Sequence, residues 1–248
     1  MQLIKSVLFN NIDDIIFGFS TKIGLDRKDP FYFNLSYNVG DSKLNVYQNR
    51  DEFFYSLGLE QEQVAFQKQV HGDTIKIINE PGYSGESDAL ITKRSGIGLA
   101  ISTADCPAIF IYDVQNKIIA AVHSGWRGTQ KKIIQKTLEI LENKFDSNPR
   151  NLLVFVGPSI SQKNYEVGPE VADLFDPIYV RSEDSKLFLD IKKSNLDMIL
   201  NFGVPEKQIE VSPYCSFEEK ELLHSYRREG KVSGRAFGII AMKEKHGK

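Results

Sequence analysis

The close spacing of short apolar segments constrains the fold of this chain more than any other sequence feature. These segments are rich in β-branched and aromatic residues, which is typical of strands. Several gaps between them are too short for a crossover helix, so many strands must pair antiparallel or in mixed sheets rather than in a doubly wound sheet. The predicted strands are residues 3–9, 14–19, 63–70, 74–78, 88–92, 98–105, 107–112 and 117–123.

Three longer segments have the pattern of helices. The middle one places Ile133, Leu138 and Leu141 on one face and its lysines and glutamates elsewhere, so its apolar face should pack on a sheet. No linker or repeat divides the chain, which predicts a single α+β domain over residues 1–248. The predicted helices are residues 45–57, 129–145 and 188–202, and further strands are predicted at 151–156, 208–212 and 234–242.

The composition is that of an ordinary globular protein. The 248 residues are 41% hydrophobic and carry a net charge of -2, so no general positive field would attract nucleic acid or anionic lipid. Asn10, Asn11, Asp13 and Asp14 interrupt the first apolar runs before a signal peptide or spanning helix could form. Two cysteines are too few for a disulfide framework. We expect a cytoplasmic monomer or weak homodimer with no nucleic-acid or membrane partner.

Histidine is scarce in this chain, with only four residues. His246 is expected in a solvated tail, whereas His71, His123 and His224 lie in segments that indicate chemistry. His71 follows a predicted strand, Cys106 stands where a proline interrupts a strand, and His123 ends a strand before a glycine-containing loop. Histidine and cysteine are ligands that zinc prefers, and three protein ligands with an open fourth position are typical of catalytic zinc. The sequence therefore predicts one metal site at converging strand ends.

Local sequence leaves other interpretations of these residues open. Taken singly, His123 could be a buried histidine beneath a loop, and Cys106 could be a small core residue. The same pair could instead act without a metal, with Cys106 as a thiolate nucleophile that His123 activates to hydrolyse an amide. A non-enzymatic module with a structural zinc is a third hypothesis, which requires Cys215 or His224 as a fourth ligand.

An anion site is predicted beside the metal site. Arg127 and the backbone amides of Gly128 and Thr129 stand at the start of the middle predicted helix, where free N–H groups and the helix dipole favour an anion. Lys131 and Lys132 occupy the first turn, where a nearby anion would rationalise them, although simple solvation explains them equally well.

Other polar residues have candidate roles in the same region. Arg50 is a planar bidentate donor that could hold the oxygens of an anion, or could be a surface arginine. Asp105 could act as an acid or base, or could cap a turn at the strand end. Arg235, between Gly234 and Ala236, could line the same pocket together with the aromatic Tyr226.

Ordered motifs across most of the chain identify a family. With them the chain resembles the laccase-like proteins long labelled multicopper polyphenol oxidases and now regarded as purine nucleoside phosphorylases, which include a bacterial peptidoglycan editing factor. The chain departs from the family pattern after the isoleucine of GPSIS, where a second glycine-proline pair is missing, and at His224, where an aromatic residue is usual. The motifs are FNLSYNVGD (33–41), Asn49 with Arg50, QVHG (69–72), DALIT (88–92), STADCP (102–107), AAVHSGWRG (120–128), GPSISQKNYEVG (157–168), Cys215, and SYRREG (225–230) with Gly234 and Arg235.

The resemblance implies a layered α/β/β/α fold with internal duplication and zinc ligands at His71, Cys106 and His123. It implies phosphorolysis of adenosine, inosine, guanosine and 5'-methylthioadenosine to a free base and ribose 1-phosphate, with adenosine deamination as a second activity. Those three ligands, together with Asp105, are the expected catalytic residues. The expected substrate-binding residues are Asn34, Arg50, Arg127 and Arg235.

Copper oxidation is the remaining alternative. A multicopper oxidase needs more histidines than the four in this chain, so that architecture is excluded. One blue-copper-like centre could still form if Met198 or Met242 supplied an axial sulfur. Copper also binds such ligands more tightly than zinc, so copper found after purification would be weak evidence of function.

Overall fold

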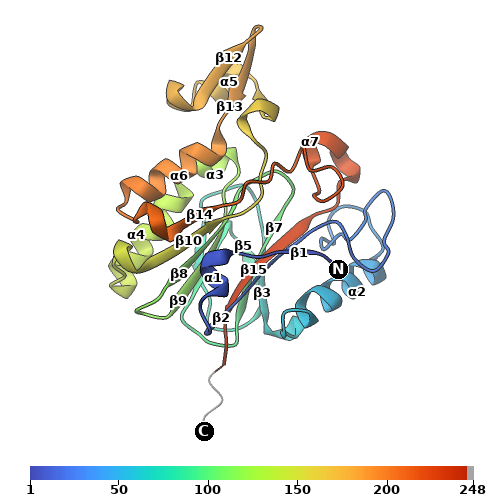
Figure 1. Ribbon diagram of the computed structural model, residues 1–248, viewed down its shortest axis with the longest axis vertical. Coiled ribbons are helices and arrows are strands. Elements are labelled where there is room, and N and C mark those ends of the chain that lie inside the picture. Colours follow the sequence, from blue (N-terminus) through green and yellow to red (C-terminus); the bar gives the residue numbers. More distant parts are fainter. Residues whose placement is uncertain (245–248) are drawn as a thin grey trace.

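Two six-stranded mixed sheets form the centre of the molecule (Figure 1). The computed structural model describes residues 1–244, and His246 lies outside the described residues. In sheet order, the first sheet contains β1 (Leu3–Ile4), β2 (Ile15–Ser20), β15 (Ala236–Met242), β7 (Gly98–Thr103), β3 (Val64–Lys68) and β5 (Gly82–Glu86). The second contains β14 (Ile209–Val211), β10 (Leu152–Val156), β8 (Ala108–Asp113), β9 (Ile118–His123), β6 (Ala89–Thr92) and β4 (Ile75–Ile77).

The core is divided into three apolar layers. One lies between the sheets and combines Phe17 of β2 with Phe110 of β8 and apolar residues of several other strands. A second lies between the second sheet and the helices α4 (Ile133–Phe145) and α6 (Ile191–Asn201), and a third between the first sheet and α2 (Lys43–Tyr55). The predicted α+β fold with layered mixed sheets is therefore confirmed, while internal duplication stays a prediction.

Consecutive strands between β3 and β7 alternate between the two sheets. Thus β3 pairs parallel with β5 and β7 in the first sheet, and β4 pairs parallel with β6 in the second. Because each intervening strand crosses to the other sheet, parallel pairs form without a crossover helix between them. The prediction of mixed sheets from the short gaps is confirmed, and this alternation is its physical basis.

Several predicted elements differ from the structure. The predicted strand 3–9 is wrong after residue 4. The chain leaves the strand at that point and begins α1 (Val7–Asn10), with Ser6 as the N-cap of this helix. The predicted helix 188–202 begins too early, since residues 186–189 form β13. Strand β5 was not predicted, because two glycines and several polar residues hide its pattern.

The predicted helix 129–145 is two helices. The first, α3 (Trp126–Gln130), begins three residues earlier than predicted, and α4 follows it after a break. Lys132 lies at the break with a φ of 60°, in the left-handed region that ends a regular helix. The apolar face predicted for α4 does pack on the second sheet.

A small third sheet projects from one end of the molecule (Figure 1). Its strands were not predicted, because each is only two to four residues long and too short to show an alternating pattern. The apolar cluster at its base includes Trp126 and Tyr165, which also line the main cavity described below. The sheet comprises β11 (Glu166–Val167), β13 (Lys186–Leu189) and β12 (Val180–Glu183), with α5 (Pro169–Ala172) beside it. A last short helix, α7 (Tyr226–Glu229), precedes β15 in the sequence.

Across residues 1–244, every helix is too short or too polar to cross a membrane.

Replacing Phe110 by alanine should lower the free energy of unfolding by about 3–5 kcal/mol, because it removes a large side chain from the layer between the sheets. Phe110 is fully buried and contacts Phe17 edge-on, with ring centroids 5.2 Å apart. Urea denaturation measures the change. The control, Tyr83→Ala at a residue that is 70% exposed, should change stability by less than about 0.5 kcal/mol. A Phe110→Ala protein as stable as the control would contradict this description of the core.

Candidate metal centre

His71, Cys106 and His123 converge from three strand ends, as predicted. His71 follows β3, Cys106 follows β7, and His123 is the last residue of β9 in the other sheet. Their ligand atoms all lie within 4.8 Å of one another, and the two imidazole rings meet edge to face at 84°. His71 is exposed, Cys106 is half-buried and His123 is buried, so the cluster opens on one side. One thiol and two imidazoles form a donor set that suits zinc.

Asp88 is a candidate site residue that the sequence analysis missed, although it opens the DALIT motif. Its Oδ1 accepts hydrogen bonds from His123 Nδ1 at 2.8 Å and from the His71 amide at 3.0 Å. Its Oδ2 accepts from the amides of Val70 and Gly72 at 3.2 and 2.7 Å. One buried carboxylate thus orients His123 with Nε2 toward the cluster and holds His71 in its left-handed turn, where φ is 57°.

Gly125 leaves the space that the cluster needs. A Cβ atom at this position would lie 3.1 Å from both Cys106 Sγ and a ring carbon of His71. The φ of Gly125 is -66°, so the requirement for glycine is one of space and not of backbone conformation. Any larger residue would press on the ligands from the loop that follows His123.

The local charges favour a thiolate at Cys106. Burial opposes ionisation, but hydrogen bonds and charge from His123 and then His71 outweigh it and lower the pKa of the Cys106 thiol to about 6. Burial likewise disfavours charge on His123, but its hydrogen bonds to Asp88 and Cys106 raise its pKa to about 9. The protein therefore presents an anionic sulfur beside imidazoles, which suits either a metal ligand or a nucleophile.

The cluster opens into a cavity of about 840 Å³. Arg50, Arg227 and Arg235 line this cavity, together with aromatic side chains that include Tyr165 and Tyr226. Within residues 1–244, arginine ion pairs are formed by Arg181 and Arg228 and not by these three. Three guanidinium groups without a carboxylate partner are groups that could bind an anion in this cavity.

Arg50 is held by aromatic rings and not by an acidic residue. Its guanidinium lies 4.3 Å from the ring centroid of Tyr37 and 4.8 Å from those of Phe66 and Phe237, and its Nε donates to the carbonyl of Leu35. Burial lowers the pKa of Arg50 to about 10. A charge placed in such surroundings is stabilised when an anion binds its remaining N–H groups.

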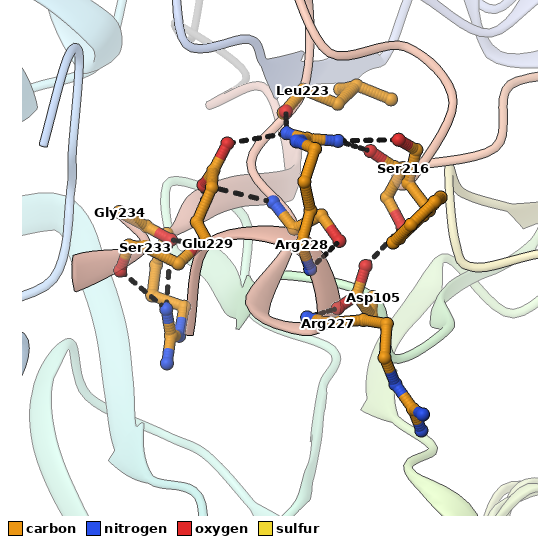
Figure 2. Close-up of polar contacts among 11 residues, drawn as sticks. Asp105, Ser216, Leu223, Arg227, Arg228, Glu229, Ser233 and Gly234 are labelled. Atoms are coloured by element: carbon orange, nitrogen blue, oxygen red, sulfur yellow. Dashed lines mark hydrogen bonds and ion pairs between the residues drawn. The ribbon is translucent and has the colours of Figure 1, made fainter. Parts of the chain in front are cut away.

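Asp105 lines the cavity, but both of its carboxylate oxygens already accept hydrogen bonds (Figure 2). Oδ1 accepts from the Ser216 hydroxyl at 2.6 Å, and Oδ2 accepts from the Arg227 amide at 2.7 Å. Its backbone has a φ of 95°, in the region that favours glycine. This geometry favours the turn-holding interpretation of Asp105, and its role as an acid or base stays a prediction.

The loops around Asp105 are held in turn by Arg228 (Figure 2). Its guanidinium donates to the carbonyls of Ser216, Phe217 and Leu223 and pairs with Glu229. Arg228 therefore organises the segment that carries Arg227 and Arg235, while its own charge is neutralised.

Two other predicted substrate-binding residues do not line the cavity. Arg127 stacks on the Trp126 ring at 4.1 Å. Asn34 is fully buried, and its side chain accepts hydrogen bonds from the amides of Ser36 and Arg235. Asn34 thus supports the backbone at Arg235, and direct substrate contact by Asn34 and Arg127 stays a prediction.

The predicted anion-binding helix start is wrong in its position. Thr129 does not begin a helix, because it lies inside the short α3 and its amide donates to the carbonyl of Gly125. Lys131 pairs with Asp73 at 3.5 Å, and Lys136 pairs with the same carboxylate at 2.6 Å. Lys132 ends up at the helix break, so neither Lys131 nor Lys132 indicates an anion.

The remaining predicted ligands lie elsewhere in the described chain. Cys215 Sγ accepts hydrogen bonds from the Ser161 amide and from Asn164, and His224 is buried beside Gly234, so neither belongs to the cluster. Met198 and Met242 pack in apolar layers and do not line the cavity. These positions favour an open site over a closed structural one, and they provide no axial sulfur for a blue-copper centre.

Comparison with known proteins places the chain in a family. Residues 16–243 match a family model described as multi-copper polyphenol oxidoreductase laccase. A relative from Bacteroides thetaiotaomicron named purine nucleoside phosphorylase is 34% identical, covering 84% of each chain. Another from Corynebacterium glutamicum with the same name is 32% identical, covering 90% of this chain and 92% of its own. The crystal structure of YlmD from Geobacillus stearothermophilus has a TM-score of 0.90 at 28% identity, covering 96% and 94% of the two chains.

Replacing Asp88 by asparagine should weaken zinc binding by roughly 10- to 100-fold. The amide nitrogen would replace one carboxylate oxygen, and it cannot accept the two hydrogen bonds that this oxygen receives. Competition with a coloured chelator measures the affinity. The control is Asp73→Asn, which alters a carboxylate paired with surface lysines and should change the affinity by less than about twofold. Equal affinities of the two variants would contradict the role given to Asp88.

In metal-free protein, alkylation of Cys106 by iodoacetamide should accelerate with a midpoint near pH 6, the pKa to which its neighbours lower it. The thiolate persists above that pH and is lost below it. Mass spectrometry of the Cys106 peptide gives the rate at each pH, and His123→Ala should move the midpoint upward. A midpoint near the ordinary thiol value of about 8.5 would show that the imidazoles do not stabilise the thiolate.

Proposed function

Because the chain belongs to the multi-copper polyphenol oxidoreductase laccase family, in which relatives are named purine nucleoside phosphorylase, we propose that it cleaves purine nucleosides with phosphate. The products are the free base and ribose 1-phosphate. The observation that carries this proposal is the cavity itself, which joins a His-Cys-His cluster to three arginines that lack an acidic partner. Phosphorolysis needs both a site for the phosphate dianion and help for the departing base.

His71, Cys106 and His123 are the residues that would hold a zinc ion. The donor set, the stabilised thiolate and the space kept by Gly125 all fit that ion. Bound zinc supplies Lewis-acid polarisation and a lowered pKa for a coordinated water. The same donors bind copper, so copper in a purified sample does not establish an oxidase.

The arginines orient the phosphate. Arg227 and Arg235 lie on the segment that Asp105 and Arg228 hold in place, and Arg235 donates Nη1 to the carbonyls of Ser233 and Gly234. Arg50 comes from α2 and packs on Phe237, where its planar guanidinium can bind two oxygens of one phosphate. Charge on the attacking phosphate is thus balanced by fixed groups that need no rearrangement.

Aromatic side chains provide surfaces for the purine. Tyr226 is 49% exposed and lines the cavity beside Arg235, and Trp126 and Tyr165 line the same cavity. Stacking recognises the face of any purine and not one pattern of ring substituents. Adenosine, inosine, guanosine and 5'-methylthioadenosine are therefore the proposed substrates, with deamination of adenosine as a second activity.

A cysteine hydrolase is the second candidate, favoured by the lowered pKa of Cys106 beside His123 and Asp88. A thiolate, an imidazole and an orienting carboxylate form the arrangement that activates a nucleophile in amide hydrolases. Its proposed substrate is an amide in a peptidoglycan precursor. Amide hydrolysis that persists after the metal has been stripped would support this candidate against phosphorolysis.

The proposed function predicts phosphate-dependent release of adenine from adenosine, with ribose 1-phosphate as the second product and about one zinc per chain. Replacing Arg50 by methionine should raise the KM for phosphate roughly 10- to 100-fold, through loss of charge-assisted hydrogen bonds. The matched control is Arg27→Met, because Arg27 is bound by Asn45, Gln48 and Asn49 and does not line the cavity. Adenine release that is independent of phosphate, or absent from zinc-loaded protein, would overturn the proposal.

A further inference from the structure

A buried polar cluster joins α6 to the loop that follows His123. Ser124, Thr129 and Asn195 are 0%, 2% and 0% exposed, and none of them lines the cavity. The Ser124 hydroxyl donates to Asn195 Oδ1 at 2.7 Å, and Asn195 Nδ2 donates to Thr129 Oγ1 at 3.0 Å. Polar side chains buried this deeply without access to substrate act on the structure around them.

Only one orientation of the Asn195 amide satisfies this cluster. Asn195 Nδ2 also donates to the carbonyl of Ile191 at 2.8 Å, and a carbonyl can only accept. The amide of Asn195 therefore cannot flip, and its Oδ1 must face Ser124. Thr129 Oγ1 lies 3.1 Å from the carbonyl of Ser124 and 3.0 Å from its hydroxyl, and both are acceptors for its proton. Asn195 on α6 thus fixes the side chain of Ser124, and Thr129 on α3 packs against both its hydroxyl and its carbonyl.

Ser124, held in this way, stands between His123, a predicted metal ligand, and Gly125, which packs on all three predicted ligands. Ser124 follows His123 and precedes Gly125, where a Cβ atom would meet Cys106, His71 and His123. The amide of Ser124 donates to the carbonyl of Pro107, next to Cys106, and the carbonyl of Gly125 accepts from the Thr129 amide. A small displacement of Ser124 would therefore move Gly125 against the ligands or away from them.

We infer that Asn195 is a positioning residue for the metal centre: by fixing Ser124 and Thr129, it holds Gly125 where His71, Cys106 and His123 can close on one ion. This inference rests on the metal centre of the proposed function. It assigns a part in metal binding to a helix that contributes no ligand. The same helix begins at Ile191, in the apolar cluster that contains Trp126 and Tyr165.

Zinc affinity, measured by chelator competition well below the unfolding temperature, tests this inference. Asn195→Ala and Ser124→Ala should each weaken zinc binding about 10-fold, as for other residues that support metal ligands from outside the coordination shell. The double variant should bind no more weakly than the worse single variant, because both changes break the same hydrogen bond. Hydrogen exchange in metal-free protein should also quicken over residues 124–131.

Thr137→Val is the matched control, since Thr137 is fully buried on α4 and bonds only to the carbonyl of Ile133 in its own helix. It should lower the unfolding temperature and leave zinc affinity unchanged. Asn195→Ala that lowers only the unfolding temperature, with wild-type zinc affinity and exchange, would overturn the inference. If the wild type itself bound no zinc, the proposed metal centre would fail, and Asn195 would have only a structural role.

Discussion

The buried carboxylate of Asp88 is the interaction on which the rest of the site depends. It stands at the start of β6 in the second sheet, where its carbonyl accepts from the His123 amide at 2.7 Å. Its side chain reaches the turn after β3 in the first sheet and binds three consecutive amides there. Charge-assisted hydrogen bonds inside a protein are strong and directional, so this one group sets both histidines relative to each other.

The alternation of strands between the two sheets explains why such a junction exists. His71 and Cys106 come from the first sheet, and His123 comes from the second. The donors can meet only because the two sheets pack face to face over a continuous apolar layer. Stability of that layer and metal affinity are therefore linked, since loss of packing between the sheets would separate the ligands.

The chemistry of the cavity follows from its arginines, which have aromatic neighbours and no acidic partner among the described residues. Arg50 has three aromatic neighbours, and Arg227 and Arg235 lie over tyrosine rings, whereas Arg228 is neutralised by Glu229. Aromatic rings hold a guanidinium in place without cancelling its charge. The cavity can therefore keep a positive field for an anion, although the chain as a whole carries a net charge of -2.

Sequence by itself determined the periodic patterns and the residue types. The apolar runs predicted mixed sheets and an amphipathic helix at α4, because side-chain alternation and helical spacing depend on local geometry alone. The scarcity of histidine, with the family motifs, pointed to His71, Cys106 and His123. Only the tertiary structure decided the hydrogen-bond partners, which come from residues far apart in the chain. Asp88 was hidden in an apolar motif, and Lys131 faced Asp73 instead of an anion. The first helix begins at Trp126 instead of Thr129, and the left-handed Lys132 divides what reads in sequence as one continuous helix.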